Sequence, residues 1–352
     1  MYKVFFITFG CKVNQYETES LKTSFQKNGY KISDTVDNAD IIIINSCTVT
    51  EYGDSGVLST LRKIRKKYPD TVIALTGCYP QVNKDSTEKL SEADIITGTK
   101  NRHELPSLVA EYLEKHSKKI NISDYSRNDT FENLDFPVFE KNTRTFMKIQ
   151  DGCNQFCTYC IIPYARGRCR SRNLESIRTE AENSARMGKK EIVLTGINLA
   201  FYGMEFGINL ADAVEVCASV DGIERIRLGS LEPEKMSDDL LRRISAIKKV
   251  CPQFHLSLQS GCDKTLKAMN RHYNTKEYLN LTEKIRSFFP ECSFTTDIMV
   301  GFPNETDEDF KESAEFVKKV GFSKVHVFRY SRRKGTPADK MSGQIPENIK
   351  SK

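Results

Sequence analysis

The chain has 352 residues, of which 39% are hydrophobic and 28% are charged, with 19 glycines and 11 prolines. This balance excludes a disordered, collagen-like or low-complexity protein, because there is ample apolar material for a core. The net charge of +6 is concentrated in two segments: residues 141–190 carry 11 basic against 4 acidic residues, and residues 323–352 carry 8 against 2. Local positive charge is typical of a surface that contacts a polyanion such as a nucleic acid, although a solvated surface would give the same pattern.

The apolar stretches, such as residues 41–44, are far shorter than the ~20 residues that a membrane-spanning helix needs. The first residues of the chain also lack the long apolar run of a signal peptide. We therefore expect a soluble, cytoplasmic protein with no membrane partner. In a reducing compartment, its 11 cysteines are expected to be buried thiols, catalytic thiols or metal ligands rather than disulfides.

Residues 1–122 alternate strand and helix signals, the pattern of a parallel sheet covered by helices. The predicted strands are 4–9, 41–45, 71–77 and 94–98, and the predicted helices are 15–28, 55–67 and 101–116. The helix over 55–67 ends in the basic run RKIRKK, which suits the negative end of its dipole. This alternation predicts an open, parallel α/β domain.

Residues 123–142 show no helical or strand period and are expected to be a linker. The alternation then resumes, with predicted strands at 145–150, 191–195, 225–229, 254–258, 294–300 and 324–328. Predicted helices lie at 173–187, 236–249, 275–289 and 306–319. Six such repeats predict a parallel sheet curled into a partial barrel, since a closed barrel needs eight.

Three cysteines stand close together in the string DGCNQFCTYCIIPYARGRCRSR, directly after the first predicted barrel strand. Cys153, Cys157 and Cys160 have the spacing Cys-x-x-x-Cys-x-x-Cys. So tight a group of thiolates indicates an iron–sulfur site, and three ligands for four irons leave one iron open to a ligand. The carboxyl end of a barrel strand is also where such folds place their active sites. The alternative is a zinc site, for which Cys169 is the only nearby candidate as a fourth ligand.

This triplet, with Tyr159 just before its third cysteine, resembles that of the radical S-adenosylmethionine superfamily. The longer string CTYCIIPYARGRCRSR is similar to the methylthiotransferase branch, and within it to the enzymes that act on threonylcarbamoyladenosine in tRNA. The resemblance implies a 4Fe–4S cluster whose open iron chelates S-adenosylmethionine, which an electron cleaves to a 5′-deoxyadenosyl radical. It also implies an electron donor such as flavodoxin or ferredoxin.

Three further cysteines, Cys11, Cys47 and Cys78, each follow a predicted strand of the first domain. The carboxyl ends of parallel strands face one crevice, and the small neighbours in GCKVNQYE, NSCTVT and TGCYP allow close backbone approach. The three cysteines can therefore meet, although three unrelated buried thiols are the alternative. The methylthiotransferase resemblance implies that they hold an auxiliary 4Fe–4S cluster that bears the sulfur to be transferred. The other five cysteines share no spacing and are expected to be ordinary buried residues.

Polar residues at the ends of the later barrel strands are expected to line the cofactor site. The resemblance implies that Gly196 and Asn198 bind the methionine amino group and that Tyr159 lies against the adenine. The remaining candidates in this group are Ser230, Glu232, Ser257 and Gln259. For each of these residues the alternative is a helix cap or a turn.

Alternate positions beyond the first cysteine group carry arginines, namely Arg166, Arg168, Arg170 and Arg172. In an extended loop they would face one surface, where guanidinium groups bind phosphate oxygens in pairs. We expect these arginines, together with Arg332 and Arg333, to contact tRNA. The alternative is that one or two pair with acidic neighbours and that one reaches the cofactor carboxylate.

The expected protein is thus α/β, with an N-terminal domain over 1–122, a linker over 123–142 and a partial (βα)6 radical-SAM barrel over 143–340. Residues 341–352 are expected to begin the connection to the small RNA-binding β domain of the family, which this chain lacks. The expected reaction is methylthiolation of C2 of N6-threonylcarbamoyladenosine next to the tRNA anticodon. S-adenosylmethionine serves as methyl donor and radical source, and no catalytic side chain is expected beyond the two clusters.

Two alternatives to this function stay open. The first is the same chemistry on isopentenyl-adenosine in tRNA or on an aspartate of a ribosomal protein; the basic segments favour RNA, and the string LGSLEP (228–233) favours the threonylcarbamoyl branch. The second is a non-catalytic, cysteine-rich RNA-binding module with a structural metal.

Overall fold

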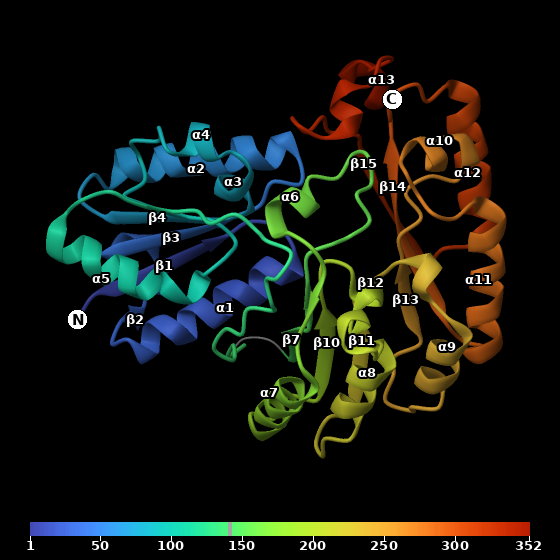
Figure 1. The fold of residues 1–352 in the computed structure, drawn as a ribbon, viewed down its shortest axis with the longest axis horizontal. Coiled ribbons are helices and arrows are strands. Elements are labelled where there is room, and N and C mark those ends of the chain that lie inside the picture. The colour runs from blue at the N-terminus through green and yellow to red at the C-terminus, as the bar shows by residue number, and fades with distance from the viewer. Residues whose placement is uncertain (140–142) are drawn as a thin grey trace. The chain divides into compact units, whose positions relative to one another are not determined.

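A computed structural model describes residues 1–139 and 143–352 of the chain (Figure 1). It divides into two compact units, the first comprising Met1–Lys141 with Ile161–Arg168 and the second comprising Asn142–Cys160 with Cys169–Lys352. This division differs from the expected domains in two respects. The segment Ile161–Arg168 belongs to unit 1 although the barrel surrounds it in sequence, and the segment expected to be a separate linker also belongs to unit 1. Residues 140–142 of the expected linker lie outside the described residues.

Unit 1 contains one fully parallel sheet in the order β2-β1-β3-β4-β5-β6. Its strands are β1 (Lys3–Thr8), β2 (Lys31–Ile32), β3 (Ile41–Ser46), β4 (Val72–Gly77), β5 (Ile95–Thr97) and β6 (Lys119–Asn121). The four predicted strands are confirmed. The two strands at the sheet edges are additional, because segments of two or three residues are too short to carry a recognisable period.

Helices cover both faces of this sheet (Figure 1). They are α1 (Lys12–Lys27), α2 (Glu51–Lys67), α3 (Cys78–Val82), α4 (Lys84–Thr87), α5 (Leu105–Lys115) and α6 (Ile162–Arg166), with short 3₁₀ turns η1 (Val36–Asn38) and η2 (Arg102–Glu104). Alternate side chains of β3 divide the core, since Ile41 and Ile43 pack with α1 and α5. Ile42 and Ile44 pack with α2 on the other face. Because all strands of this sheet are parallel, their carboxyl ends lie at one edge of it.

Unit 2 carries the six predicted barrel strands, all of which are confirmed. They form two parallel sheets, β11-β10-β7 and β12-β13-β14-β15, and a short antiparallel pair, β8-β9, stands beside them. The strands are β7 (Arg144–Lys148), β8 (Gln150–Asp151), β9 (Arg170–Ser171), β10 (Glu191–Thr195), β11 (Arg225–Leu228), β12 (Ser230–Leu231), β13 (Gln253–Leu256), β14 (Ser293–Val300) and β15 (Lys324–Arg329). Only Gly229 separates β11 from β12, so the two sheets follow one another as the partial barrel that the sequence predicts.

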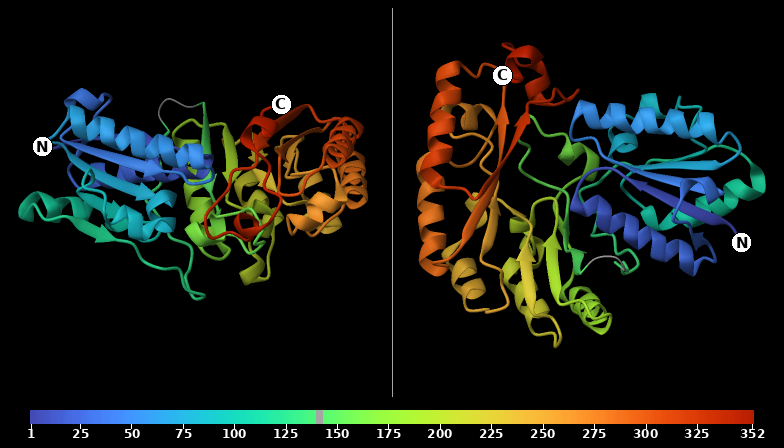
Figure 2. Two further views of the ribbon diagram at one scale, coloured as in Figure 1. Left: turned by 90° about the horizontal axis from the view of Figure 1, so that it is seen from above. Right: turned by 180° about the vertical axis from the view of Figure 1, so that it is seen from behind.

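Most helices of unit 2 cover the outer side of these strands (Figure 2). They are α7 (Leu174–Arg186), α8 (Leu210–Ala218), α9 (Asp238–Ser245), α10 (Asp263–Ala268), α11 (Thr275–Phe288) and α12 (Asp307–Val320). The short α13 (Glu347–Lys350) lies beside the end of β14 instead (Figure 1), and the 3₁₀ turns are η3 (Leu199–Phe201), η4 (Met204–Phe206), η5 (Pro233–Lys235) and η6 (Pro337–Lys340). Capping boxes at Asn274 and Thr306 begin α11 and α12. The helix predicted over 236–249 is shorter than expected, because Val250 already pairs with Ile226 beside β11.

The segment expected to be a linker is tied to unit 1 by polar contacts, although it has no helix or strand over 123–139. Asp129 accepts from Lys100 at 2.7 Å, and Asp135 accepts from Lys27 at 2.5 Å. The hydroxyl of Tyr125 donates to Thr99 Oγ1 at 3.0 Å. These contacts fasten the segment onto unit 1.

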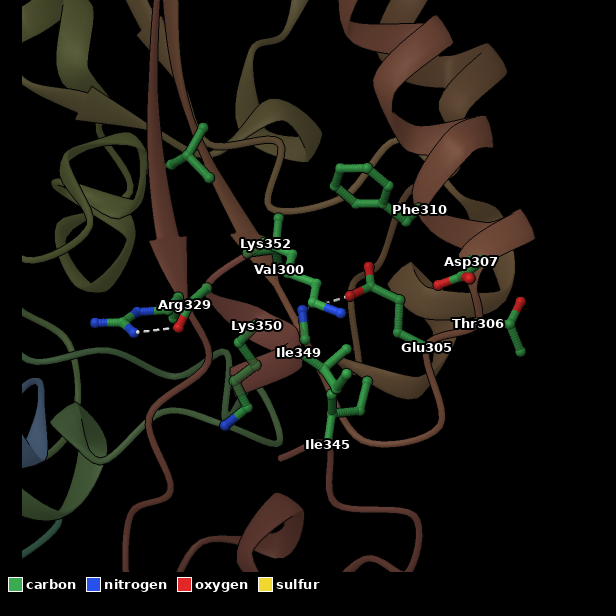
Figure 3. A pocket seen from close by; sticks show the side chains of 13 residues that line it. Val300, Glu305, Thr306, Asp307, Phe310, Arg329, Ile345, Ile349, Lys350 and Lys352 are labelled. Atoms are coloured by element: carbon green, nitrogen blue, oxygen red, sulfur yellow. Dashed lines mark hydrogen bonds between the residues drawn. The ribbon is translucent and has the colours of Figure 1, made fainter. Parts of the chain in front are cut away.

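The last residues of the chain fold back onto unit 2 and wall a pocket of about 580 Å³ (Figure 3). The loop between β14 and α12 also lines this pocket, and in it Glu305 Oε2 accepts a hydrogen bond from the backbone N of Gly301 at 2.5 Å. Lys350 of α13 donates to the carbonyl of Tyr330 at 2.9 Å, which holds the terminal segment in place. Among the described helices, none is long and apolar enough to cross a bilayer.

Candidate functional site

The loop that carries Cys153, Cys157 and Cys160 follows β8 and is held by the end of α10. Thr158 donates its backbone N to the carbonyl of Met269 at 3.0 Å, and Asn270 Nδ2 donates to the carbonyl of Phe156 at 3.3 Å. Phe156 has a positive φ of 49°, a conformation that costs a non-glycine residue energy and is found where surrounding contacts enforce it. These contacts therefore fix the conformation of the loop that carries the three thiols.

Nitrogen donors point at the sulfur atoms of this loop. Arg271 Nη1 lies 3.1 Å from the Sγ of Cys157, and the backbone N of Gln155 lies 3.5 Å from the Sγ of Cys153. Asn198 Nδ2 lies 3.7 Å from the Sγ of Cys153. Burial raises the pKa of the Cys153 thiol, and the two N–H donors act against burial. Such donors stabilise sulfur that carries negative charge, as the ligands of an iron–sulfur cluster do.

Arg271 is the functional residue that sequence reasoning missed at this site. Its guanidinium also pairs with Glu232, and the two side chains are 4% and 7% exposed. Burial raises the pKa of Glu232 to about 7, while Arg271 acts in the opposite direction. Arg271 stands 114 positions from Cys157, outside any recognisable spacing, so no local signal could have identified it.

The residues expected around the methionine amino group gather beside Cys153. The backbone N of Asn198 donates to Gln150 Oε1 at 2.7 Å, and a side chain at Gly196 would come within 2.8 Å of the same oxygen. Asn198 Oδ1 is buried, and no group in the described part of the chain donates a hydrogen bond to it. An unpartnered buried acceptor next to a cluster ligand fits a donor supplied by a bound cofactor, as the ammonium of S-adenosylmethionine would be.

The other expected cofactor residues fall into two groups. The carbonyl of Ser257 accepts from the hydroxyl of Tyr273 at 2.6 Å and from Arg271 Nη2 at 3.3 Å, which joins it to the Glu232 pair. Gln259 has a φ of 69°, and Ser230 is exposed on β12. Tyr159 packs partly buried against the cluster of Met269, Phe302, Tyr330 and Ala338. Of these residues, Glu232 and Ser257 are the ones that share hydrogen-bond partners with the cysteine loop.

The three cysteines of unit 1 stand at the carboxyl ends of adjacent strands. Cys11 caps α1 after β1, Cys47 follows β3, and Cys78 opens α3 directly after β4. A side chain at Gly10 would lie 2.7 Å from Cβ of Cys47, and one at Gly77 would lie 2.5 Å from the carbonyl of Ser46. The glycines beside Cys11 and Cys78 thus permit the close approach of the segments that carry the thiols.

Burial dominates the electrostatics of two of these thiols, Cys47 and Cys78. It raises the pKa of Cys78 to about 11 and also raises the pKa of Cys47. Within the described residues, no group of three His, Cys, Asp or Glu side chains converges closely enough to hold a single metal ion. A four-iron cube is larger than one ion and is held by thiolates at separate corners, so it does not need such convergence.

Three of the arginines that were expected to form one basic surface are buried instead. Arg166, Arg170 and Arg172 are 1%, 6% and 2% exposed. Residues Ile162–Arg166 form the helix α6, so the extended alternation on which the expectation depends is absent there. Acidic neighbours hold these side chains: Arg166 binds Glu17 at 2.8 Å, Arg170 lies 3.6 Å from Asp151, and Arg172 binds Glu180 at 2.5 Å. These three arginines therefore do not form the exposed basic surface that the expectation assumed, and the acidic pairing that was its alternative is what the structure shows.

The remaining basic candidates differ in exposure. Arg168 lies on the surface. Arg332 is 57% exposed and pairs with Asp339 at 2.5 Å, whereas Arg333 is only 6% exposed. Arg168 and Arg332 stay predictions as RNA contacts, and burial of Arg333 argues against such a role for it.

Among the described residues, no cysteine forms a disulfide. Among the five outside the two triplets, Cys217, Cys251 and Cys262 are buried. Cys169 is partly buried and accepts a hydrogen bond from Gln150 Nε2 at 3.1 Å, so it contacts the same glutamine that positions Asn198.

Solved structures with this fold are radical enzymes. TsrM from Kitasatospora setae, a radical S-adenosylmethionine methyltransferase with cobalamin and a [4Fe-4S] cluster bound, matches 96% of this chain and 77% of its own with a TM-score of 0.71 at 12% identity. OxsB, a cobalamin-dependent S-adenosylmethionine radical enzyme, matches 96% of this chain and 54% of its own with a TM-score of 0.63 at 13% identity. At these identities the likeness shows the fold alone.

Sequence relatives are much more similar. The model of the Radical SAM superfamily matches residues 147–317, and that of Uncharacterized protein family UPF0004 matches residues 3–98. Threonylcarbamoyladenosine tRNA methylthiotransferase MtaB of Aquifex aeolicus is 41% identical over 348 residues, which cover 99% of this chain and 85% of that protein. The tRNA-2-methylthio-N(6)-dimethylallyladenosine synthase of Clostridium botulinum is 40% identical over 361 residues, covering 99% of this chain and 79% of that protein. With two cysteine triplets in place and this identity over nearly its whole length, the chain belongs to the radical S-adenosylmethionine methylthiotransferase family.

Proposed function

We propose that this enzyme adds a methylthio group to C2 of N6-threonylcarbamoyladenosine next to the tRNA anticodon, with S-adenosylmethionine as methyl donor and radical source. We further propose that Cys11, Cys47 and Cys78 hold an auxiliary 4Fe–4S cluster that provides the sulfur. The observation that carries the proposal is the position of these thiols at the ends of adjacent strands, with glycines beside two of them that a side chain would obstruct. A methylthio transfer needs a sulfur source as well as a radical source, and the chain has a separate cysteine triplet for each role.

The residues around the barrel cysteines support the binding of S-adenosylmethionine. When bound, the cluster on Cys153, Cys157 and Cys160 supplies the electron that cleaves this cofactor. Asn198 Oδ1 is available to accept a hydrogen bond from the methionine ammonium. The backbone N of Asn198 donates to Gln150 Oε1, which holds this residue in place. The buried pair of Arg271 and Glu232 keeps a charged donor beside Cys157.

The acceptor is the finer part of the proposal. Relatives that act on threonylcarbamoyladenosine and on dimethylallyladenosine are 41% and 40% identical to this chain, so identity alone does not separate them. The string LGSLEP at 228–233 favours the threonylcarbamoyl acceptor. Isopentenyl-adenosine in tRNA, or a ribosomal-protein aspartate, is the second candidate.

Two partners follow from the proposal. The exposed Arg168 and Arg332 are the proposed contacts for tRNA phosphates. Cleavage of S-adenosylmethionine also consumes one electron per event, for which we propose a small carrier of the flavodoxin or ferredoxin class.

An anaerobic reconstitution tests this function. The unmodified protein is expected to bind about eight irons, in two four-iron clusters. Substitution of Cys153, Cys157 and Cys160 with Ala should halve the iron and abolish formation of 5′-deoxyadenosine, whereas substitution of Cys11, Cys47 and Cys78 should halve the iron and abolish methylthiolation only. Zinc in place of iron, with no nucleoside product, would support a non-catalytic RNA-binding module.

The acceptor is then identified from its product. Mass spectrometry of nucleosides from tRNA incubated with the reconstituted enzyme should show 2-methylthio-N6-threonylcarbamoyladenosine. Its isopentenyl counterpart in the same digest, with the threonylcarbamoyl nucleoside unchanged, would assign the second candidate acceptor instead. A methylthiolated ribosomal protein, with tRNA unmodified, would assign the ribosomal-protein aspartate as the acceptor.

A further inference from the structure

A buried ionic triad lies in unit 1, formed by Glu17 of α1, Arg102 of η2 and Arg166 of α6. Glu17 is fully buried, and the two arginines are each 1% exposed. Glu17 Oε1 lies 2.8 Å from Arg102 Nη1 and 2.8 Å from Arg166 Nη1, and Arg166 Nη2 lies 3.0 Å from Glu17 Oε2. The triad therefore joins three elements that are far apart in the sequence.

The triad adjoins the proposed ligands of the auxiliary cluster. Arg166 Nη2 also donates to Asn14 Oδ1 at 2.7 Å, and Asn14 Nδ2 in turn donates to the carbonyl of Ser46, the residue before Cys47. The same Asn14 Oδ1 lies 3.9 Å from the Sγ of Cys11. One side chain, Asn14, therefore connects Arg166 both to Cys11 and to the backbone that leads into Cys47.

The charges within the triad do not balance. It contains two guanidinium groups and one carboxylate, and a buried uncompensated charge destabilises a fold strongly. Within residues 1–139 and 143–352, the buried Nε and Nη2 of Arg102 have no hydrogen-bond partner. Since nearly all buried donors in native proteins are satisfied, these two nitrogens indicate an acceptor outside the described residues.

We propose that Arg102 and Arg166 are positioning residues for the auxiliary site, where their excess positive charge compensates the anionic assembly of three thiolates and an iron–sulfur cluster. The inference rests on the proposed auxiliary cluster and adds the residues that stabilise it. Arg102 would donate its unpartnered N–H groups to sulfur of that assembly. Arg166 lies six residues after Cys160 in sequence, so the segment that follows the barrel cysteines contributes a residue to this triad.

The competing explanation is a structural ion pair that only fastens the segment Ile161–Arg168 onto unit 1. Thr99 Oγ1 donates to the carbonyl of Ala165 at 2.5 Å, so this segment has anchors besides Arg166. The two explanations differ in one measurable property. A structural pair affects folding, whereas a compensating charge also affects the reduction potential of the cluster, since reduction adds a negative charge that a nearby cation stabilises.

The test uses the full chain with Cys153, Cys157 and Cys160 changed to Ala, so that only the proposed auxiliary ligands remain. In this background, iron content and the midpoint potential of the cluster are measured, the potential by a titration followed with electron paramagnetic resonance. Arg102→Met makes the triad neutral and should shift the potential to more negative values. Glu17→Gln raises the triad to two positive charges and should shift it to less negative values, while Arg102→Lys should stay close to the parent.

A matched control separates these shifts from general damage. Arg172 and Glu180 form a buried pair in unit 2, each 2% exposed and 2.5 Å apart, so Arg172→Met removes a comparable cation. It should lower the thermal unfolding midpoint of the iron-free protein and leave the potential unchanged. If Glu17→Gln does not fold, the contrast between Arg102→Met and Arg102→Lys still decides the question.

Shifts of the midpoint potential in opposite directions for Arg102→Met and Glu17→Gln, with no shift for Arg172→Met, would establish the compensating role. A parent that holds four irons whose potential is the same in all triad variants would show that the triad is only structural and overturn the inference. A parent that binds no iron would overturn the auxiliary cluster itself, and the inference with it. Iron content of the parent therefore distinguishes the two failures.

Discussion

Arg271 donates from Nη1 to the Sγ of Cys157 over 3.1 Å, while its Nη2 pairs with the buried carboxylate of Glu232. One guanidinium thus joins a cluster ligand to an acidic residue at the end of another barrel strand. Hydrogen bonds to ligand sulfur make a cluster easier to reduce, because they stabilise the added negative charge. We therefore expect the potential of the cluster proposed on Cys153, Cys157 and Cys160 to depend on Arg271, which lies outside the cysteine motif.

Removal of this contact should lower that potential. In a protein with Cys11, Cys47 and Cys78 changed to Ala, Arg271→Met should shift the midpoint potential of the remaining cluster to more negative values and slow formation of 5′-deoxyadenosine. The substitution also leaves Glu232 buried without its partner, which costs about 3–5 kcal/mol of stability. A titration followed by electron paramagnetic resonance and a thermal unfolding curve measure the two effects.

The double variant Arg271→Met/Glu232→Gln separates them. It removes both charges and should recover much of the lost stability, because no buried charge stays unpaired. The potential should remain shifted, since the N–H donor to Cys157 is still missing. Recovery of the potential along with the stability would show that the hydrogen bond to sulfur has no separate role.

Gly10 is expected to be essential for the unit 1 site and not for the barrel site. Its φ is +102°, and an added Cβ would lie 2.7 Å from Cβ of Cys47. Gly10→Ala should therefore reduce bound iron from about eight to about four and leave formation of 5′-deoxyadenosine intact. The measurement is iron content together with product analysis of the reconstituted protein.

Gly29 provides the matched control, because it has a similar φ of +85° with no atom within 4 Å of an added Cβ. Both substitutions force an alanine into a left-handed conformation, which costs roughly 1–2 kcal/mol. Gly29→Ala should lose that stability and keep its iron. Equal iron loss in both variants would attribute the effect to backbone strain rather than to the approach of Cys47.

Asn198 is expected to determine affinity for S-adenosylmethionine. Asn198→Ala removes the buried, unpartnered Oδ1 that would accept from the methionine ammonium, a hydrogen bond to a charged group. Such a bond contributes about 1.5–3 kcal/mol, so the dissociation constant should rise roughly tenfold or more. Equilibrium dialysis with the reconstituted enzyme measures this constant.

Asn173→Ala is the control for this experiment. Asn173 caps α7 by accepting from the backbone N of Ser176 at 2.7 Å, and its loss should cost about 1 kcal/mol of stability. Affinity for S-adenosylmethionine should be unchanged. Unaltered affinity in Asn198→Ala would exclude the amide oxygen as the ammonium acceptor.

Glu305, in the pocket beside the C-terminal residues, should make stability depend on pH. Burial raises the pKa of this carboxyl, so the folded protein holds its proton more tightly than the unfolded chain does. The stabilisation is complete below the ordinary carboxyl pKa of about 4.3 and is lost as the pH rises through the higher folded value. Thermal unfolding midpoints of the iron-free protein across this window should fall more steeply in the parent than in Glu305→Gln.

The neighbouring Glu308 is exposed on α12 and serves as the control. Glu308→Gln should keep the pH dependence of the parent. A pH profile of Glu305→Gln that matches the parent would show that another group causes the slope.

Short-range patterns in the sequence were sufficient to predict the strands and the helices between them. Apolar runs predict the parallel strands, because a strand buried between two helical layers must be apolar on both sides, as residues 41–44 are. The spacing of Cys153, Cys157 and Cys160 is likewise local, since one loop carries all three thiols. Cys11, Cys47 and Cys78 could be grouped only because parallel strands end at one edge of the sheet.

The arginines show where this reasoning fails. Their alternation suggests one exposed surface, but α6 interrupts the extended chain, and Arg166 is buried against Glu17, a residue 149 positions away. The sequence does not indicate that Arg166 and Glu17 are in contact, because an arginine has the same residue type whether its side chain faces solvent or an acidic partner. Only the fold identifies which arginines are exposed.

The sequence by itself therefore determined the two-part α/β architecture, the six cysteines and the membership of a radical enzyme family, all of which depend on neighbours along the chain or on one rule of sheet geometry. The tertiary structure alone decided which polar side chains surround those cysteines: Arg271 at Cys157, Asn198 at Cys153, and the triad of Glu17, Arg102 and Arg166. The physical reason is that hydrogen bonds and charge compensation act through space over a few ångströms. The residues that provide them are brought together by packing and not by spacing.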